Sequence, residues 1–309
     1  QVLGFGDREE FKDPSLLGEG TNWQDEIFRN ASMHNHQINI SGGNEGTTYS
    51  LSGGYLSQDG IGIGSSFERF SARVNMDNKI TNWLSTGLRA SVAKTQQNNT
   101  IDNGNIIRTA IQQLPEVPAK NPDGSWGMQS ENMYGTYFTN PVAEALMREN
   151  YEKGLQLYVD FFADITLYKG LVFRAEYAGN YYYNNNYQYT PSYDYYTQES
   201  LGSRSASNGS NWTLKTYLTY TNTFGRHQIT AMAGHEAQEN NWESLSGTRS
   251  DYFLNSVHEL DAGSSLTAKN SSSKGSSAIE SYFGRVNYGF DDRYLLTLTV
   301  RGDGSSTFA

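Results

Sequence analysis

Residues 155–167 read Leu-Gln-Leu-Tyr-Val-Asp-Phe-Phe-Ala-Asp-Ile-Thr-Leu. Every odd-numbered position in this stretch is apolar, whereas the even-numbered positions include Asp160 and Asp164. Successive side chains of a β-strand point to opposite faces, so the alternation predicts a strand with one apolar and one polar face. The stretch is also longer than the ~5–6 residues typical of strands in soluble sheets.

The same period of two recurs along most of the chain. It is found at residues 38–40, 49–55, 70–77, 84–92, 171–178, 212–220, 229–237, 282–288 and 296–300. Together with residues 155–167, these segments predict about ten strands. Arg73, Arg89, Arg174 and Arg285 all lie on the polar side of the alternation. Because a charge facing lipid costs ~2–4 kcal/mol at the bilayer midplane, these arginines indicate the face turned away from lipid.

The connections between the predicted strands alternate in length. Short turns are expected at residues 43–46, 80–83, 169–170, 224–226 and 290–293, and long connections at 57–66, 98–152, 182–210 and 247–277. Short periplasmic turns and long extracellular loops are typical of outer-membrane barrels, whereas a soluble β-sandwich has no reason to keep this order. We therefore predict an all-β fold, part of an antiparallel transmembrane β-barrel in the outer membrane of a Gram-negative cell.

Composition excludes several other classes of protein. The 309 residues include no Cys, carry a net charge of -10 and are 36% hydrophobic and 13% aromatic. The acidic balance argues against nucleic acid as a partner, because phosphate binding needs clustered Lys and Arg. No apolar run approaches the ~20 residues of a membrane-spanning helix. The five histidines show no metal-ligand spacing, so neither a metal nor a cofactor is expected.

Several blocks of sequence, in the same order along the chain, resemble the SusC/RagA family of TonB-dependent outer-membrane transporters of Bacteroidetes. They are Trp23-Gln24-Asp25-Glu26-Ile27-Phe28, Ser41-Gly42-Gly43, Gly53-Gly54-Tyr55, Phe67-Glu68-Arg69-Phe70-Ser71, Asn121-Pro122-Asp123-Gly124-Ser125, Lys169-Gly170-Leu171, Tyr282-Phe283-Gly284-Arg285 and Arg301-Gly302-Asp303-Gly304. None is specific alone, but together they identify the chain as similar to part of such a barrel.

The resemblance implies a barrel of about 22 strands that is filled by an N-terminal plug. It also implies a SusD-like surface lipoprotein as a lid, energy from the TonB complex, and oligosaccharides or peptides as substrates. Nothing in this chain resembles the plug or the closing strands. We therefore expect residues 1–33 to be a linker from the missing plug. Residues 34–309 are expected to be about ten strands of the barrel, with extracellular loops at 98–152, 182–210 and 247–277.

Aromatic residues in the predicted loops are candidates for contact with substrate. Rings stack on sugar faces and Asn amides bond hydroxyls, which makes Tyr183 and Tyr187 in the Tyr/Asn-rich tract 181–187 candidates. Trp126, Tyr134 and Tyr137 in the longest loop are candidates for the same reason. The alternative for the tract is an aromatic girdle at the membrane interface, and the sequence favours this alternative.

Two other classes of function were compared with the importer. A structural or adhesive surface β-protein is the alternative reading, and Arg301-Gly302-Asp303 spells an adhesion tripeptide, although it ends a predicted strand. A lipase-type barrel enzyme is not expected. The Ser-rich residues 264–277 contain no Gly-x-Ser-x-Gly elbow, and no Ser/His/Asp arrangement supports catalysis.

Overall fold

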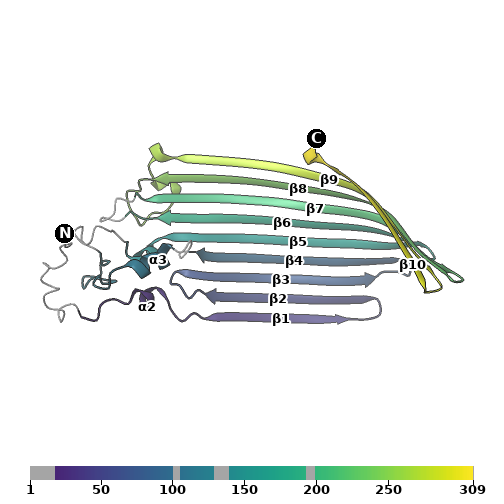
Figure 1. Ribbon diagram of the computed structural model, residues 1–309, viewed down its shortest axis with the longest axis horizontal. Coiled ribbons are helices and arrows are strands. Elements are labelled where there is room, and N and C mark those ends of the chain that lie inside the picture. The colour runs from purple at the N-terminus through teal and green to yellow at the C-terminus, as the bar shows by residue number, and fades with distance from the viewer. Residues whose placement is uncertain (1–17, 100–104, 129–138, 193–198, 309) are drawn as a thin grey trace, which may run out of the picture.

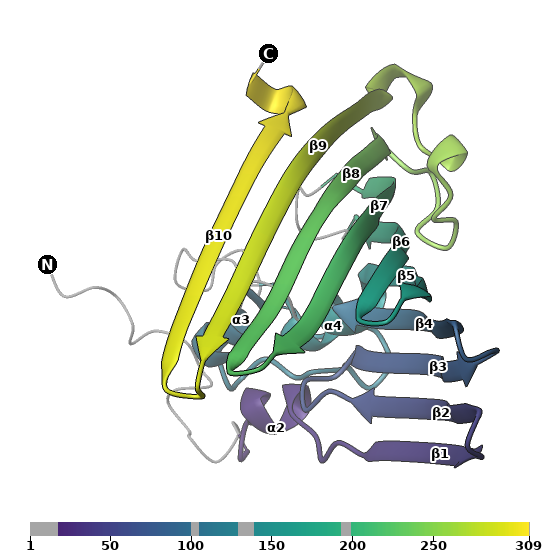
Figure 2. The ribbon, with the colours of Figure 1, turned by 90° about the vertical axis from the view of Figure 1, so that its right-hand side faces the viewer.

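A computed structural model describes residues 18–99, 105–128, 139–192 and 199–308. One antiparallel sheet of ten strands, in sequence order, makes up most of this part of the chain (Figure 1). The strands are β1 (Met33–Gly43), β2 (Thr47–Asp59), β3 (Ser65–Lys79), β4 (Leu84–Asn99), β5 (Glu149–Tyr168), β6 (Leu171–Thr190), β7 (Leu201–Phe224), β8 (His227–Ser250), β9 (Lys269–Phe290) and β10 (Tyr294–Ser305). This confirms the predicted all-β class and the number of strands. The sheet is twisted, so that β10 is steeply inclined to β1 (Figure 2).

Within the described residues, helical structure is confined to short segments beside the sheet. The α-helices are α2 (Trp23–Ile27), α3 (Asn105–Gln112) and α4 (Pro141–Met147), and the 3-10 turns are η2 (Leu260–Ala262), η3 (Ser265–Thr267) and η4 (Ser306–Phe308). None of the helices in the described residues is long and apolar enough to cross a membrane.

The period of two divides the sheet into an apolar face and a polar face. Ile40, Leu51, Val74, Ala90 and Val159 are successive register partners across β1 to β5, and therefore lie side by side on the apolar face. Large apolar side chains on this face are exposed in every part of the sheet, among them Ile38, Phe70, Leu157, Phe161, Leu214, Leu218, Val286, Leu298 and Val300. Soluble monomers rarely expose a continuous apolar surface of this extent, so this face is suited to contact with lipid.

The height of the apolar surface fits a membrane. On β6 it runs from Leu171 to Tyr181, which is ~33 Å of strand at ~3.3 Å per residue. A tilt of ~40° reduces this to ~25 Å, the height of the lipid-facing band in outer-membrane barrels. Paired rings lie near the margin of the apolar surface that is farther from the short turns. They include Tyr177 with Trp212, whose ring centroids are 6.5 Å apart. Aromatic side chains favour this interface because one end is apolar and the other is wet.

The short turns occur where the alternation predicts them, all at one end of the sheet (Figure 1). Gly170, in the turn between β5 and β6, has a φ of 82°, a conformation that glycine adopts without strain. Asp291 and Asp292, between β9 and β10, have φ values of 57° and 52°. Two successive positive φ values are the geometry of a type I′ turn, whose twist matches that of the flanking strands.

The long connections are shorter than predicted, because the strands continue beyond the apolar band. β6 extends to Thr190 and β7 begins at Leu201, so residues 182–190 and 201–210 of the expected loop are strand. The expected loop 247–277 likewise reduces to 251–268, and 98–152 to 100–148. Outside lipid both faces of a strand are wet, so backbone pairing continues there without the apolar alternation that reveals it in the sequence.

The two outer strands of the sheet each have one unpaired edge. In the described residues β1 pairs only with β2, and β10 pairs only with β9. An unpaired backbone N–H or C=O costs several kcal/mol in hydrocarbon, so a spanning sheet must close on itself. The described strands are therefore part of a barrel wall rather than a closed barrel.

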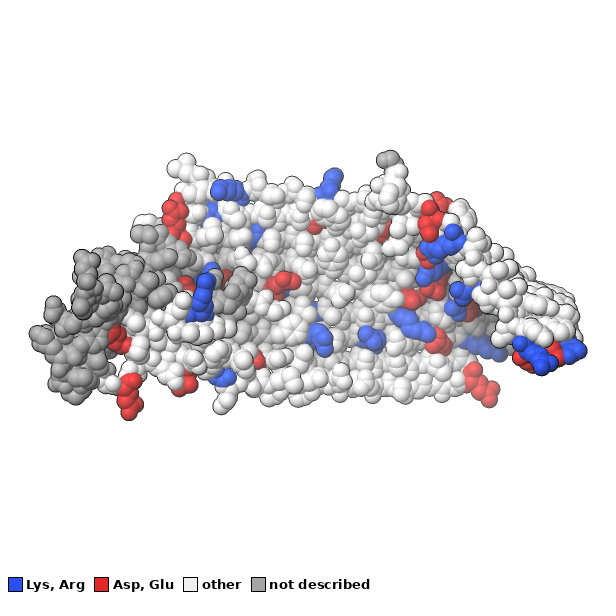
Figure 3. Space-filling model, in the orientation of Figure 1, with Lys and Arg blue, Asp and Glu red and all other residues white. Residues whose placement is uncertain are grey.

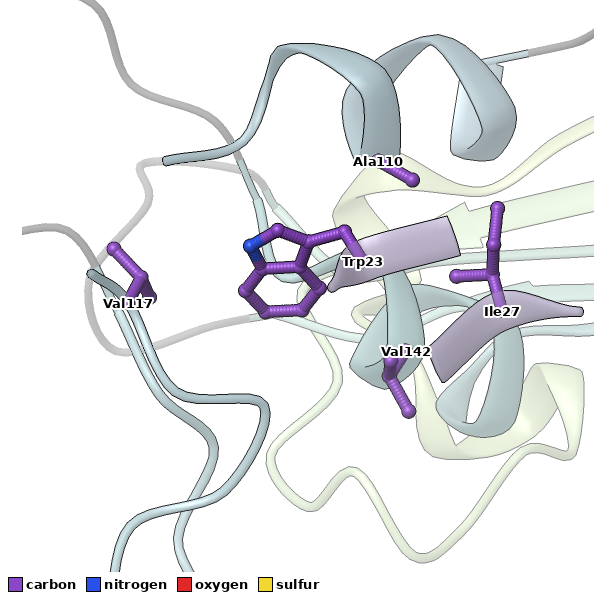
Figure 4. Close-up of a cluster of buried hydrophobic side chains, with 5 residues drawn as sticks. All are labelled: Trp23, Ile27, Ala110, Val117 and Val142. Atoms are coloured by element: carbon purple, nitrogen blue, oxygen red, sulfur yellow. The ribbon is translucent and has the colours of Figure 1, made fainter. Parts of the chain in front are cut away.

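A small hydrophobic core lies at the end of the sheet that carries the long connections (Figure 1). Trp23 and Ile27 of α2 pack there against Ala110 of α3, Val117 and Val142 of α4 (Figure 4). We call this unit the rim cap. It joins the segment before β1 to the connection between β4 and β5. Residues 18–33, expected to be part of a linker, therefore include a helix with buried side chains.

Asn140 holds the rim cap together through four hydrogen bonds. Its Oδ1 accepts from the backbone N–H groups of Val142 and Ala143, which caps the first turn of α4. Its Nδ2 donates to the carbonyls of Ala119 and Gly127 at 2.9 and 3.0 Å. The side chain is 1% exposed, so water cannot replace these partners.

Replacing Asn140 is therefore expected to loosen the rim cap. Asn140→Ala removes the helix cap and the side-chain donor to the Gly127 carbonyl, at a cost of about 2 kcal/mol. The Ala119 carbonyl still accepts from the Gly127 N–H at 3.2 Å. Asn140→Ser keeps an oxygen acceptor for the helix cap, without burying a charge against the two carbonyls, and should cost less. Hydrogen exchange of α3 and α4 in the full-length protein should be fastest in Asn140→Ala and intermediate in Asn140→Ser. Equal exchange rates in all three proteins would contradict this role.

The assignment of the two faces is tested by adjacent positions on β7. Leu218 lies on the apolar face and Thr219 on the polar face. We expect Leu218→Arg to lower the free energy of unfolding of the full-length protein in lipid by about 2–4 kcal/mol. Thr219→Arg, with the same added charge, should change it little. Urea titration of the two variants measures the difference, and similar losses would show that the faces are wrongly assigned.

Candidate functional site on the polar face

Charged side chains cross the polar face of the sheet in a continuous band, which we call the charge belt. Figure 3 shows interleaved blue and red side chains that cross the strands toward the end with the short turns. The register places members of the belt directly opposite one another, from Asp77 on β3 to Asp303 on β10. One cross-strand row is Asp77, Gly87, Phe162, Glu176, Lys215, Glu236, Ser281 and Asp303.

At the β3 to β6 end of the belt, two ion pairs enclose an aromatic ring. Arg89 donates to both carboxylate oxygens of Asp77, at 2.7 and 2.9 Å. Both of these bonds come from Nη2 of Arg89, whereas Arg174 pairs with Asp164 through two nitrogens, Nε and Nη2, at 2.6 and 2.5 Å. The guanidinium carbons lie 5.5 and 4.4 Å from the centroid of the Phe162 ring. The two-nitrogen pair with Asp164 fixes the plane of the Arg174 guanidinium, and the Phe162 ring lies within cation–π distance of both arginines.

At the β6 to β10 end, cations and carboxylates alternate across neighbouring strands. The Lys215 ammonium lies 3.7 Å from Glu176 and 3.8 Å from Glu236. Arg301 contacts Glu236 at 2.8 Å and Asp303 at 2.7 Å. Because Lys215 and Arg301 remain partly exposed, each pair contributes at most ~1 kcal/mol to stability. Their main consequence is a wettable surface on which opposite charges alternate.

Rings on the polar face lie over glycines of the neighbouring strands. Phe162 is opposite Gly87, and a Cβ built on that glycine would be 2.2 Å from the ring. Further from the short turns, Tyr182 covers Gly209 and Trp242 covers Gly275, where a Cβ would meet the rings at 2.6 and 2.8 Å. The register aligns the latter four residues in one row across β6, β7, β8 and β9. We call Tyr182 and Trp242 with their glycines the ring row.

The ring row presents flat aromatic surface at the end of the polar face that carries the long connections. Trp242 is 42% exposed although its ring lies against the backbone of β9. A flat, exposed indole whose rear side is supported can stack on a sugar ring or a peptide side chain. The Ser- and Asn-rich neighbourhood of the ring row adds hydrogen-bonding groups, including Asn180, Asn211 and Asn240 on the same face.

The structure separates the aromatic residues that the sequence suggested as substrate contacts. Trp126 packs against the rim cap, with the Lys120 ammonium 4.7 Å from its ring centroid. Tyr183 and Tyr187 lie in β6, on the face opposite the ring row. The Tyr187 ring stacks on Tyr151 at 4.6 Å. Tyr134 and Tyr137 lie outside the described residues.

Tyr182 and Trp242 were not among the predicted site residues. The signal that identifies them is position parity: the polar face of β6 carries Arg174 and Glu176, and Tyr182 follows in the same alternation. The same step from Glu236 leads to Trp242 on β8. Reaching Tyr182 and Trp242 required β6 and β8 to continue beyond residues 178 and 237, where the alternation seen in the sequence ends.

No cluster of three or more potential metal ligands occurs in the described residues. Arg301 and Asp303, from the adhesion-type tripeptide, belong to the charge belt. The Arg301 Nε donates a hydrogen bond to the Asp303 carboxylate at 2.7 Å. Their charges are therefore used within the sheet.

The chain is similar over most of its length to curated TonB-dependent receptors. TonB-dependent receptor P3 of Formosa agariphila is 30% identical over 94% of this chain and 30% of its own length. TonB-dependent receptor SusC of Bacteroides thetaiotaomicron is 28% identical over 96% of this chain and 31% of its own length. The chain thus spans about a third of the curated relatives it matches. No protein-family model matches it.

A solved structure of the RagAB peptide transporter has the same fold. It aligns with 94% of this chain and 34% of its own, with a TM-score of 0.76 and 24% sequence identity. A likeness at this level of identity establishes the architecture, that of a stretch of barrel wall in a larger protein.

The packing of Phe162 is tested by adding one methyl group beneath it. Gly87→Ala is expected to destabilise the full-length protein by about 1–3 kcal/mol, because the ring is held between Arg89 and Arg174 and cannot withdraw freely. Gly53, with nothing within 4 Å of its Cβ position, is the matched control. Gly53→Ala should be neutral or slightly stabilising. Urea titration that ranks Gly53→Ala as the more damaging change would contradict this packing.

Proposed function

We propose that this chain, which belongs to the SusC/RagA family of TonB-dependent receptors, forms part of the wall of an outer-membrane nutrient importer. The observation that carries the proposal is that the two faces of the sheet differ in polarity. One face is an apolar band of membrane height, and the other is a wettable surface with the charge belt and the ring row. A sheet of this kind suits a barrel whose interior is filled with water and polar groups.

The orientation follows from the connections. The short turns face the periplasm, and the long connections with the rim cap face outward, which is the usual arrangement of outer-membrane barrels. The unpaired edges of β1 and β10 require further strands of the whole protein, which the relatives' greater length would provide. The ring row then lies toward the outer mouth of the barrel, and the charge belt nearer the periplasm.

The whole protein would act with partners that this chain does not contain. A SusD-like surface lipoprotein would close the outer mouth, and the TonB complex would supply energy through a plug. The substrate class is oligosaccharides or peptides. The name of one solved relative, a peptide transporter, supports peptides, whereas the exposed ring row supports oligosaccharides as well. Trp242 and Tyr182 are the residues we assign to substrate contact.

The exposed apolar face argues against a soluble adhesive or structural protein. Leu218 and Val300, 41% and 71% exposed, would face water in such a protein, at a cost that lipid contact removes. The relatives are receptors and transporters by name, so we do not assign an enzymatic activity to the chain.

Uptake by cells tests both the importer and the ring row. Cells that express the full-length protein with its lipoprotein partner would receive a mixed pool of oligosaccharides and peptides. Mass spectrometry of the medium identifies which components disappear. We expect Trp242→Ala to slow the uptake of its substrates about tenfold, the effect of losing ~1.4 kcal/mol of stacking, and Trp242→Phe to retain much of the rate.

Ser244→Ala, also on the polar face of β8, serves as a control for a small nearby change. If neither the oligosaccharides nor the peptides disappear from the medium in a way that depends on the protein, the importer proposal is wrong. If uptake occurs but Trp242→Ala leaves it unchanged, the importer stands and the ring row loses its role.

A further inference from the structure

We propose that the lipid-facing side of β7, β8 and β9 carries a groove that binds the sugar-bearing headgroup of an outer-leaflet lipid. The groove consists of two adjoining hollows of about 580 and 550 Å³, which share Asn208, Glu243 and Lys274. We call it the outer groove. The proposal rests on the membrane orientation proposed above, but concerns the opposite face from the ring row.

The alternation of side chains places the outer groove on the same face as the apolar band. On β7 the residues of this face are Leu218, Thr216, Leu214 and Trp212, followed by Ser210, Asn208 and Ala206. Besides the three shared residues, side chains of this parity line each hollow: Ser210, Asn241 and Ser276 the first, and Ala206, Leu245 and Ser272 the second. A lipid beside the barrel therefore meets first the apolar band and then this polar surface.

The boundary between band and groove is marked by Trp212. Its indole N–H donates to the Glu239 carboxylate at 3.1 Å, and Asn241 donates to the same carboxylate at 3.0 Å. Tryptophan favours the membrane interface because its ring is apolar and its N–H needs a polar partner. From Trp212 toward the long connections, Ser210, Asn208 and Ala206 bring no large apolar side chain to this face of β7.

The height of the outer groove selects the kind of headgroup. Asn208 and Ala206 are four and six residues beyond Trp212, which is ~13 and ~20 Å along the strand. At a tilt of ~40° this gives ~10–15 Å above the hydrocarbon boundary. The headgroup region of a phospholipid leaflet is only ~5–8 Å thick. Ser210, at the lower edge of the groove, is two residues beyond Trp212 and therefore only ~5 Å above this boundary. A phospholipid headgroup thus reaches only the lower edge, and a lipid that carries a chain of sugars extends along the whole groove.

The chemistry of the lining favours hydroxyl-rich ligands. Most of the side chains are small and carry a hydroxyl or an amide, so they leave room and offer both donors and acceptors. Lys274 and Glu243 are register partners, and the Glu243 carboxylate also accepts from the Asn208 amide at 2.8 Å. One cation beside one carboxylate gives a balanced charge, which suits sugar hydroxyls better than a phosphate.

The floor of the groove is rigid. It is formed by the backbone around Gly209 and Gly275, and the rings of Tyr182 and Trp242 lie against these glycines on the polar face. Rings that cover the glycines hold three strands in register at this height. A ligand in the outer groove thus meets a preformed surface, which reduces the entropic cost of binding.

The test uses adjacent positions on β9 that point to opposite faces. Ser276 lines the outer groove, and Ser277 points to the polar face. Purified full-length protein is placed in nanodiscs of phosphatidylethanolamine with lipooligosaccharide, then extracted, and native mass spectrometry counts retained lipids. We expect wild type and Ser277→Trp to retain lipooligosaccharide, and Ser276→Trp, whose side chain obstructs the first hollow, to retain about tenfold less.

Two further samples distinguish the possible ligands. Nanodiscs of phosphatidylethanolamine alone should give no specifically retained lipid, and free core oligosaccharide should bind far more weakly than the lipid-linked form. Equal retention in wild type and Ser276→Trp would overturn the proposal, as would free saccharide binding as tightly as the lipid. Because nutrient uptake uses the other face, Ser276→Trp should leave uptake unchanged. The outer groove and the importer can therefore fail independently.

Discussion

The structure depends on one constraint, which is that backbone N–H and C=O groups within a membrane must bond to each other. In hydrocarbon each unpaired group costs several kcal/mol, so every strand needs a neighbour on both sides. Here each strand from β2 to β9 has two neighbours, in an unbroken sequence of hairpins. The order of the sheet, the short turns at one end and the open edges at β1 and β10 are all consequences of this pairing.

Because pairing occupies the backbone, the side chains are free to meet different surroundings on the two faces. The apolar face has little internal packing to satisfy, and Val159 or Leu298 needs only to be compatible with lipid. The polar face is more specific. Arg89 and Arg174 reach carboxylates on neighbouring strands, and Phe162 packs between them over Gly87. Ion pairs and covered glycines there give the wall a definite surface instead of a loosely hydrated one.

Beyond the apolar band the same sheet serves other purposes. β5 to β9 have 20 to 24 residues, about twice the ~9–11 that cross a bilayer. In this outer part the polar face carries the ring row, and the other face carries the outer groove. The rings of Tyr182 and Trp242 support both surfaces, since they present a flat face on one side and stiffen the groove's floor on the other.

The sequence by itself determined the strands within the membrane, their faces and the positions of the short turns. Lipid on one side and water on the other impose a period of two, as in residues 155–167, and tight turns need particular residues such as Gly170. Only the tertiary structure decided how far the strands extend and which residues share a surface. In the wet region of residues 182–210 strand formation depends on neighbouring strands, and pairs such as Trp242 with Gly275 arise from register across strands, which local sequence does not contain.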